Sequence, residues 1–116
     1  TPTVEQYGEL VKFYTQLLGL EITRSWGDPQ HPCLMISCGD NSCLEILPGD
    51  EAVSRGGALA HLAFATTKVD ELIERVREAG YEIAYEPYDT DAIGAPIHIA
   101  FCYGPIGEYI EFFWEK

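Results

Sequence analysis

The sequence contains two similar segments, and this internal repeat limits the possible folds more than any other feature. Val4 begins one amphipathic helical pattern and Val69 begins another. Each segment then reaches a glutamate inside a strand-like run, Glu45 after 41 residues and Glu111 after 42. Such a period indicates one supersecondary unit used twice, so that each copy buries the other's apolar face. The alternative is a chance similarity between two segments that each combine a helix with a hairpin.

Hydrophobic periodicity predicts nearly the same elements in both copies. Apolar residues recur at steps of three and four residues in helices at 4–18 and 69–79, and Gly19 and Gly80 can end these helices with a positive φ. Strands are predicted at 20–26, 33–37, 43–47, 58–66, 81–85, 96–103 and 109–114. No strand equivalent to 58–66 precedes the first helix, so the first copy is expected to lack it. The pattern predicts an α+β fold.

Length and composition indicate one small globular domain. The chain has 116 residues, of which 47% are hydrophobic and 22% charged. We expect a single domain over 1–116, with module one at 1–50, an acidic, glycine-bearing linker at 48–57 and module two at 58–116. The apolar runs are too short for a membrane span or a secretory signal, so a cytoplasmic location is expected.

The charge balance narrows the classes of partner. Nineteen acidic residues against seven basic ones give a net charge of −12, and the basic residues do not cluster. A nucleic-acid-binding protein needs a basic surface, so that class is excluded. The negative electrostatic potential of such a chain disfavours polyanionic substrates and favours cations, neutral small molecules and divalent metals.

The four cysteines, at positions 33, 38, 43 and 102, lack the spacing of a zinc site. We interpret them as buried free thiols in a reducing compartment.

Strand alternation singles out three polar residues. His61, Glu45 and Glu111 each point away from the large apolar residues of their strands. A carboxylate in the middle of a strand is costly to bury without a partner or a metal. One imidazole and two carboxylates would suit Zn²⁺, Ni²⁺, Co²⁺, Mn²⁺ or Fe²⁺. A structural histidine with two solvent-facing glutamates is the alternative.

Four motifs, in this order, resemble those of the vicinal oxygen chelate superfamily, which includes glyoxalase I, bleomycin-resistance proteins, extradiol dioxygenases and methylmalonyl-CoA epimerase. They are FYTQLLGLE at 13–21, CLEI at 43–46, AHLAF at 60–64 and IAFCYGPIGEYIEFF at 99–113. The resemblance covers essentially the whole chain and is greatest to glyoxalase I-like members. It implies two βαβββ modules that form an open, curled, mixed sheet around a metal site.

The same resemblance implies a set of metal ligands. Glu45, His61 and Glu111 occupy three of the four ligand positions, and the strand that would carry the fourth is not in the sequence. One divalent ion is expected, Zn, Ni, Co or Mn. Iron is less suited, because the dioxygenases use two histidines and one glutamate.

The resemblance further implies an enzyme, a metal-dependent lyase or isomerase acting on a small molecule with vicinal oxygens through an enediolate-like intermediate. Glu111 is the expected general base, and Glu45 is a ligand and a possible second base. His98 is a candidate substrate contact or proton carrier, and the alternative is a surface or hydrogen-bonded structural histidine. Arg24 is a candidate anion clamp, and Tyr85, Tyr88 and Trp26 are candidates to flank the cavity. A homodimer is expected. The alternative function is a metal-free binding protein that sequesters a cationic drug such as bleomycin in an acidic, aromatic groove.

Overall fold

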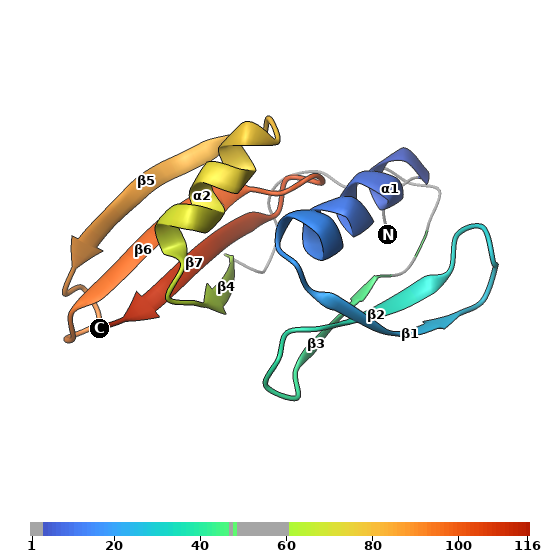
Figure 1. Ribbon diagram of the computed structural model, residues 1–116, viewed down its shortest axis with the longest axis horizontal. Helices are drawn as coiled ribbons and strands as arrows, with labels where there is room; N and C mark the ends of the chain where they lie inside the picture. The colour runs from blue at the N-terminus through green and yellow to red at the C-terminus, as the bar shows by residue number, and fades with distance from the viewer. Residues whose placement is uncertain (1–3, 47, 49–60) are drawn as a thin grey trace. The chain divides into compact units, whose positions relative to one another are not determined.

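The computed structural model describes residues 4–46, 48 and 61–116 of the chain. The chain divides into two compact units, Thr1–Ser54 and Arg55–Lys116. The described elements of the first unit are α1 (Val4–Lys12), a π-helical turn η1 (Phe13–Leu17), β1 (Glu21–Trp26), β2 (Cys33–Ser37) and β3 (Cys43–Ile46) (Figure 1). Those of the second are β4 (Leu62–Ala65), α2 (Val69–Glu78), β5 (Ile83–Thr90), β6 (Ile97–Tyr103) and β7 (Tyr109–Glu115).

The described residues of each unit form one open sheet. The first sheet has the order β1-β2-β3 and is antiparallel throughout. The second has the order β4-β7-β6-β5, and it is mixed because β4 runs parallel to β7 while the other pairs are antiparallel. The predicted α+β class is therefore confirmed. The second unit has the predicted order of one strand, one helix and three strands.

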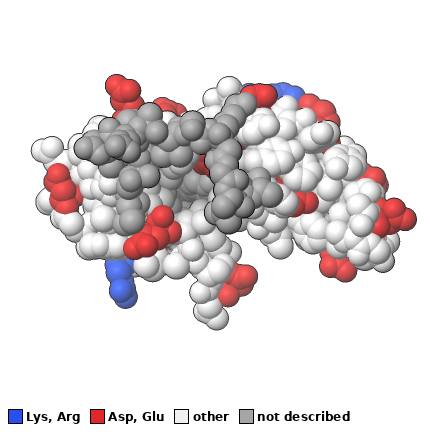
Figure 2. Space-filling view, turned by 180° about the vertical axis from the view of Figure 1, so that it is seen from behind, with Lys and Arg blue, Asp and Glu red and all other residues white. Residues whose placement is uncertain are grey.

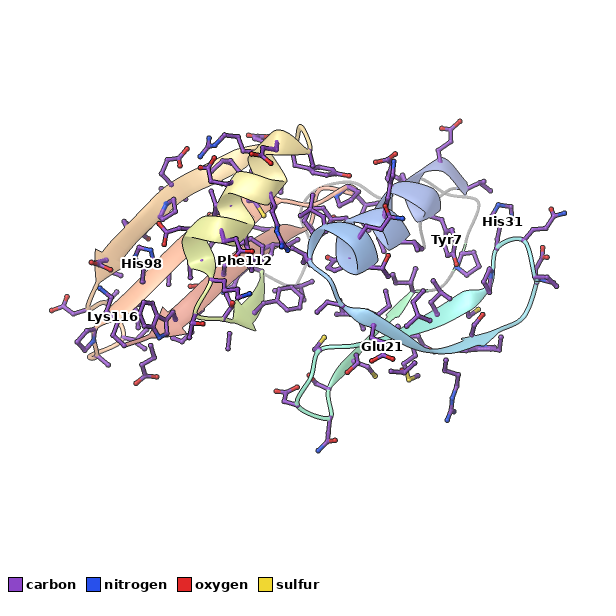
Figure 3. All side chains as sticks on the ribbon, in the orientation of Figure 1. Tyr7, Glu21, His31, His98, Phe112 and Lys116 are labelled. Carbon is purple, nitrogen blue, oxygen red and sulfur yellow. The ribbon has the colours of Figure 1, made fainter. Side chains whose placement is uncertain are left out.

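The core of the second unit lies between α2 and one face of its sheet. Val69, Ile73 and Val76 of α2 are fully buried, as are Ile110 and Phe112 of β7. The helix α2 packs against β5, β6 and β7, and Figure 3 shows the labelled Phe112 beside α2. The small β6 residues on this face, Ala100 and Cys102, leave room for the larger side chains of β7 and α2.

The first helix differs from the prediction in its second half. The predicted helix at 4–18 consists of α1 followed by η1, where Leu18 N donates to Phe13 O, a spacing of five residues. The Thr15 hydroxyl donates to Val11 O at 2.6 Å and so binds a carbonyl that would accept the Thr15 N–H in a regular α-helix. The predicted helix-ending glycines are confirmed, since φ is 74° at Gly19 and 89° at Gly80.

Tyr7 connects α1 to the loop before β2. Its hydroxyl donates to Pro32 O at 2.6 Å, and its ring meets the His31 ring edge-on (Figure 3). The other buried apolar residues in the described part of this unit are Leu10, Phe13, Tyr14 and alternate positions of β2 and β3. His31 is thus part of a contact that fixes the loop.

Two expectations about single elements were wrong. A strand at 81–85 followed by a loop was predicted, but β5 continues through Pro87 to Thr90. This is possible because β5 is an edge strand whose register with β6 shifts between Tyr85 and Tyr88, so the missing N–H of Pro87 interrupts no regular ladder. The cysteines are free as predicted, but only Cys102 is buried, whereas Cys33 and Cys38 are partly exposed and Cys43 is exposed.

Three predicted segments reach beyond the described residues. The strand predicted at 58–66 contains β4, and its first residues lie outside the described part of the chain, as does Leu47. Of the predicted linker at 48–57, only residue 48 is described. Neither helix of the described residues is long and apolar enough to cross a membrane.

Candidate active site

The parallel pairing of β4 with β7 brings His61 to Glu111. His61 immediately precedes β4, and Ala63 of β4 is opposite Glu111 of β7. His61 Nε2 lies 2.9 Å from Glu111 Oε2. Two residues 50 positions apart in the sequence therefore form one polar pair in the second unit.

The pair combines a buried acid with an accessible imidazole. Glu111 is the one charged residue that is buried among the described residues, and its side chain is 11% exposed, against 38% for that of His61. Burial of a carboxylate is costly without a charged or hydrogen-bonding partner. His61 supplies that partner, and its exposure leaves the pair open to a ligand from one side.

Strand alternation correctly predicted which face the pair occupies. Leu62 and Phe64 are opposite Ile110 and Phe112, on the face that packs against α2. Glu111 lies on the other face, which we call the Glu111 face. It consists of the side chains of the second sheet that point away from α2.

Aromatic rings surround the pair on the Glu111 face. Phe101 of β6 is opposite Glu111, and it stacks on Tyr109 with ring centres 5.1 Å apart and planes 17° apart. The His61 ring is edge-on to both, at 6.0 Å from Phe101 and 6.3 Å from Tyr109. These contacts limit the orientations that the imidazole can adopt.

The donors of the pair fit a divalent metal ion. An imidazole nitrogen and a carboxylate oxygen are donor types that Zn²⁺ and related ions accept. The 2.9 Å between His61 Nε2 and Glu111 Oε2 is the length of a hydrogen bond, so the two groups contact each other directly. Among the described residues, no group of three or more histidine, cysteine, aspartate or glutamate side chains is arranged to hold an ion.

Glu45 and Arg24 belong to the first unit. Both are exposed, and both lie on the face of the β1-β2-β3 sheet that carries Met35, with Met35 opposite each of them. Leu34, Ile36 and Ile46 form the buried face. The ligand role of Glu45 beside His61 and Glu111 stays a prediction. So does the binding of a substrate anion by Arg24.

The structure does not bring His98 together with His61 and Glu111. His98 is opposite Trp114 on the α2 side of the sheet, and its ring contacts two carboxylates, Nε2–Asp70 Oδ2 and Nδ1–Asp89 Oδ1, each at 2.8 Å. Burial lowers the pKa of His98, but the hydrogen bonds to Asp89 and Asp70 outweigh it and the net shift is upward. Lys116 completes this cluster by binding Asp89 at 2.7 Å, and Figure 3 shows His98 and Lys116 towards the same end of the sheet.

Phe101 and Tyr109 were missed as neighbours of the site by reasoning from the sequence. A signal for them existed in the turn that joins β6 to β7. Gly104 N donates to Glu108 O, and Tyr103 is opposite Tyr109. Pairing the strands outward from this turn places Phe101 opposite Glu111. The same register pairs His98 with Trp114 and so places His98 on the α2 side of the sheet.

Comparison with known proteins gives a family and several structural relatives. Residues 3–112 match the model of the Glyoxalase/Bleomycin resistance protein/Dioxygenase superfamily. No curated protein matches the chain.

Three solved structures illustrate the likeness. The trypanothione-dependent glyoxalase I of Leishmania major is 28% identical with a TM-score of 0.73, over 97% of this chain and 81% of that one. A glyoxalase family protein from Enterococcus faecalis is 27% identical with a TM-score of 0.69, over 92% of this chain and 87% of that one. A glyoxalase I variant from Zea mays is 24% identical with a TM-score of 0.78, over 96% of this chain and 41% of that one, and it supports the fold alone. The family match covers almost the whole sequence, and the chain therefore belongs to the Glyoxalase/Bleomycin resistance protein/Dioxygenase superfamily.

Proposed function

We propose that this chain is a divalent-metal-dependent lyase or isomerase of the glyoxalase type. Its substrate is a small molecule with two vicinal oxygens, and the reaction passes through an enediolate-like intermediate. The observation that carries the proposal is the buried Glu111 carboxylate, 2.9 Å from the accessible His61 imidazole. Superfamily membership and the glyoxalase I neighbours support it.

The proposed roles follow from the position of each group. When bound, Zn²⁺, Ni²⁺, Co²⁺ or Mn²⁺ supplies a Lewis acid that favours the charge developing on the substrate oxygens. His61 and Glu111 would hold the ion, and Glu45 is the third proposed ligand. Glu111 is also the proposed general base: released or loosened from the ion, it would take the carbon-bound proton. Its side chain is 11% exposed, so it is largely shielded from water.

Metal binding tests the proposal directly. We expect about one equivalent of divalent metal after purification without chelators, measured by elemental analysis, and saturable Zn²⁺ binding by calorimetry. Glu111→Gln removes one charged donor and should weaken Zn²⁺ affinity by about a hundredfold. Glu115→Gln is the matched control, because Glu115 lies on the same strand but is exposed. It should bind Zn²⁺ as the wild type does.

Two outcomes would overturn the metal-dependent function. One is wild-type protein that neither retains metal nor binds it in calorimetry. The other is equal Zn²⁺ affinity in the wild type and Glu111→Gln. If metal is absent but bleomycin binds at micromolar concentration, the alternative of a sequestering protein replaces the enzyme.

A further inference from the structure

The Glu111 face carries a continuous series of aromatic rings that leads from its edge to the proposed site. Tyr88 contacts Tyr85 at 6.4 Å between ring centres, and Tyr85 contacts Phe101 edge-on at 5.8 Å. Phe101 stacks on Tyr109, and both rings contact His61. All of these residues lie in the second unit, on β5, β6, β7 and the residue before β4.

The outer rings of this series are more exposed than the inner ones. Tyr88 is 40% exposed and Tyr85 58%, whereas Phe101 and Tyr109 are half-buried and Glu111 is buried. Adjacent exposed rings on one surface often mark a binding site. The series therefore offers ring surface to a ligand at its outer end and a carboxylate–imidazole pair at its inner end.

The charges around the series select against anions. In the described part of the second unit, every basic side chain forms an ion pair elsewhere: Lys68 and Arg75 with Glu71, Arg77 with Glu74 and Glu86, and Lys116 with Asp89. The Glu111 face itself carries Glu111 and Glu115. Figure 2 shows acidic side chains scattered over the visible surface. An anionic group placed on the outer rings, Tyr85 and Tyr88, would therefore meet no unpaired lysine or arginine from the described part of this unit.

Tyr109 adds a hydrogen-bond donor inside the series. Its ring is half-buried and contacts both Phe101 and Tyr103. Its phenolic hydroxyl can donate as well as accept a hydrogen bond. Rings that present π faces together with phenolic hydroxyls suit a planar ligand whose charge is zero or positive.

We propose that Tyr85, Tyr88, Phe101 and Tyr109 form a subsite for an aromatic group of the substrate, uncharged or cationic, whose reacting oxygens lie at His61 and Glu111. This inference rests on the proposed function for the position of the reacting atoms. It goes beyond that function by assigning the substrate class, a small aryl compound, and by naming the residues that select it.

Ring-bearing probes of different charge test the subsite without any need for turnover. The purified protein is titrated with benzyltrimethylammonium, benzyl alcohol and benzoate, and also with cyclohexylmethanol, which lacks an aromatic ring. NMR follows the ring signals of the four subsite residues. We expect saturable shifts with benzyltrimethylammonium and benzyl alcohol, and affinities about tenfold weaker for benzoate and for cyclohexylmethanol.

Substitutions show whether the rings cause the preference. Tyr85→Ala removes an exposed ring and should weaken benzyl alcohol binding about two- to tenfold. Tyr85→Leu keeps apolar area without the ring and should fall between Tyr85→Ala and the wild type. Trp114→Ala is the matched control, because it removes a partly exposed ring from the α2 side of the same sheet. It should leave probe binding unchanged.

The inference and the proposed function can fail separately. Benzoate that binds as tightly as benzyl alcohol, or the absence of shifts with every ring-bearing probe, would overturn the aryl subsite even if Zn²⁺ binds through Glu111. Probe binding that Tyr85→Ala leaves intact would also overturn it. Failure to bind metal, with aryl selectivity retained, would overturn the enzyme and leave an aromatic binding surface.

Discussion

Gly104 begins the turn before Glu111 and lies against the Glu108 side chain. A Cβ on Gly104 would overlap the Glu108 side chain, whose Oε2 accepts the Ile106 N–H at 2.9 Å. Because the end of a glutamate side chain can move, we expect Gly104→Ala to displace Glu108 and lose that hydrogen bond. The free energy of unfolding should fall by about 1 kcal/mol, measured by urea denaturation.

A second glycine provides the control for this substitution. Gly8 lies within α1, and a Cβ there would meet no atom within 4 Å. Gly8→Ala should therefore raise the free energy of unfolding by about 0.5–1 kcal/mol. If Gly104→Ala raised the free energy of unfolding, or lowered it by well over about 3 kcal/mol, the expected displacement of the Glu108 side chain would be contradicted.

At the scale of elements, His98 connects α2 to the sheet. It bridges Asp70 in the first turn of α2 and Asp89 of β5, while Lys116 binds Asp89 from beyond β7. The folded-state pKa of His98 is raised, so its stabilising contribution is complete below the unfolded value near 6.5 and is lost as pH rises through the folded value. The pKa of Asp89 is lowered by its hydrogen bonds to Lys116 and His98, so its contribution is lost as pH falls below about 4.

We therefore expect His98 to add a pH dependence to the stability of the protein. The free energy of unfolding of the wild type, relative to that of His98→Gln, should be greatest between about pH 4 and 6.5 and should decrease above that range. Denaturation curves at several pH values measure this difference. Asp70→Asn should reduce the difference without abolishing it, because Asp89 remains. A difference that increases above neutral pH would contradict the assignment.

At the scale of the whole molecule, the net charge of −12 opposes the compact state. Exposed ion pairs such as Arg75–Glu71 and Arg77–Glu86 contribute little to stability and are themselves screened by salt. We expect the screening of repulsion among the acidic residues to be the larger effect. Raising NaCl from about 20 mM to about 500 mM should therefore increase Tm by a few degrees, measured by calorimetry. A lower Tm at high salt would show that the ion pairs dominate.

Local pattern was sufficient for much of the fold. The helix beginning at Val69, the strand at Cys33–Ser37 and the positive φ of Gly19 all follow from periodicity or from the properties of one residue type. The extension of β5 through Pro87 could not be predicted, because a proline is tolerated there only at the edge of a sheet. Position in a sheet is a long-range property that no short window of sequence contains.

The sequence by itself determined the repeat, the α+β class and the face on which His61 and Glu111 lie, because side-chain alternation in a strand has a period of two whatever the strand pairs with. Only the tertiary structure decided that β4 pairs in parallel with β7, which places the imidazole against the carboxylate, and that Phe101 is opposite Glu111. It also placed His98 on the α2 side, between two aspartates. Strand order and register depend on contacts between distant segments, and a shift of one residue would reverse every face.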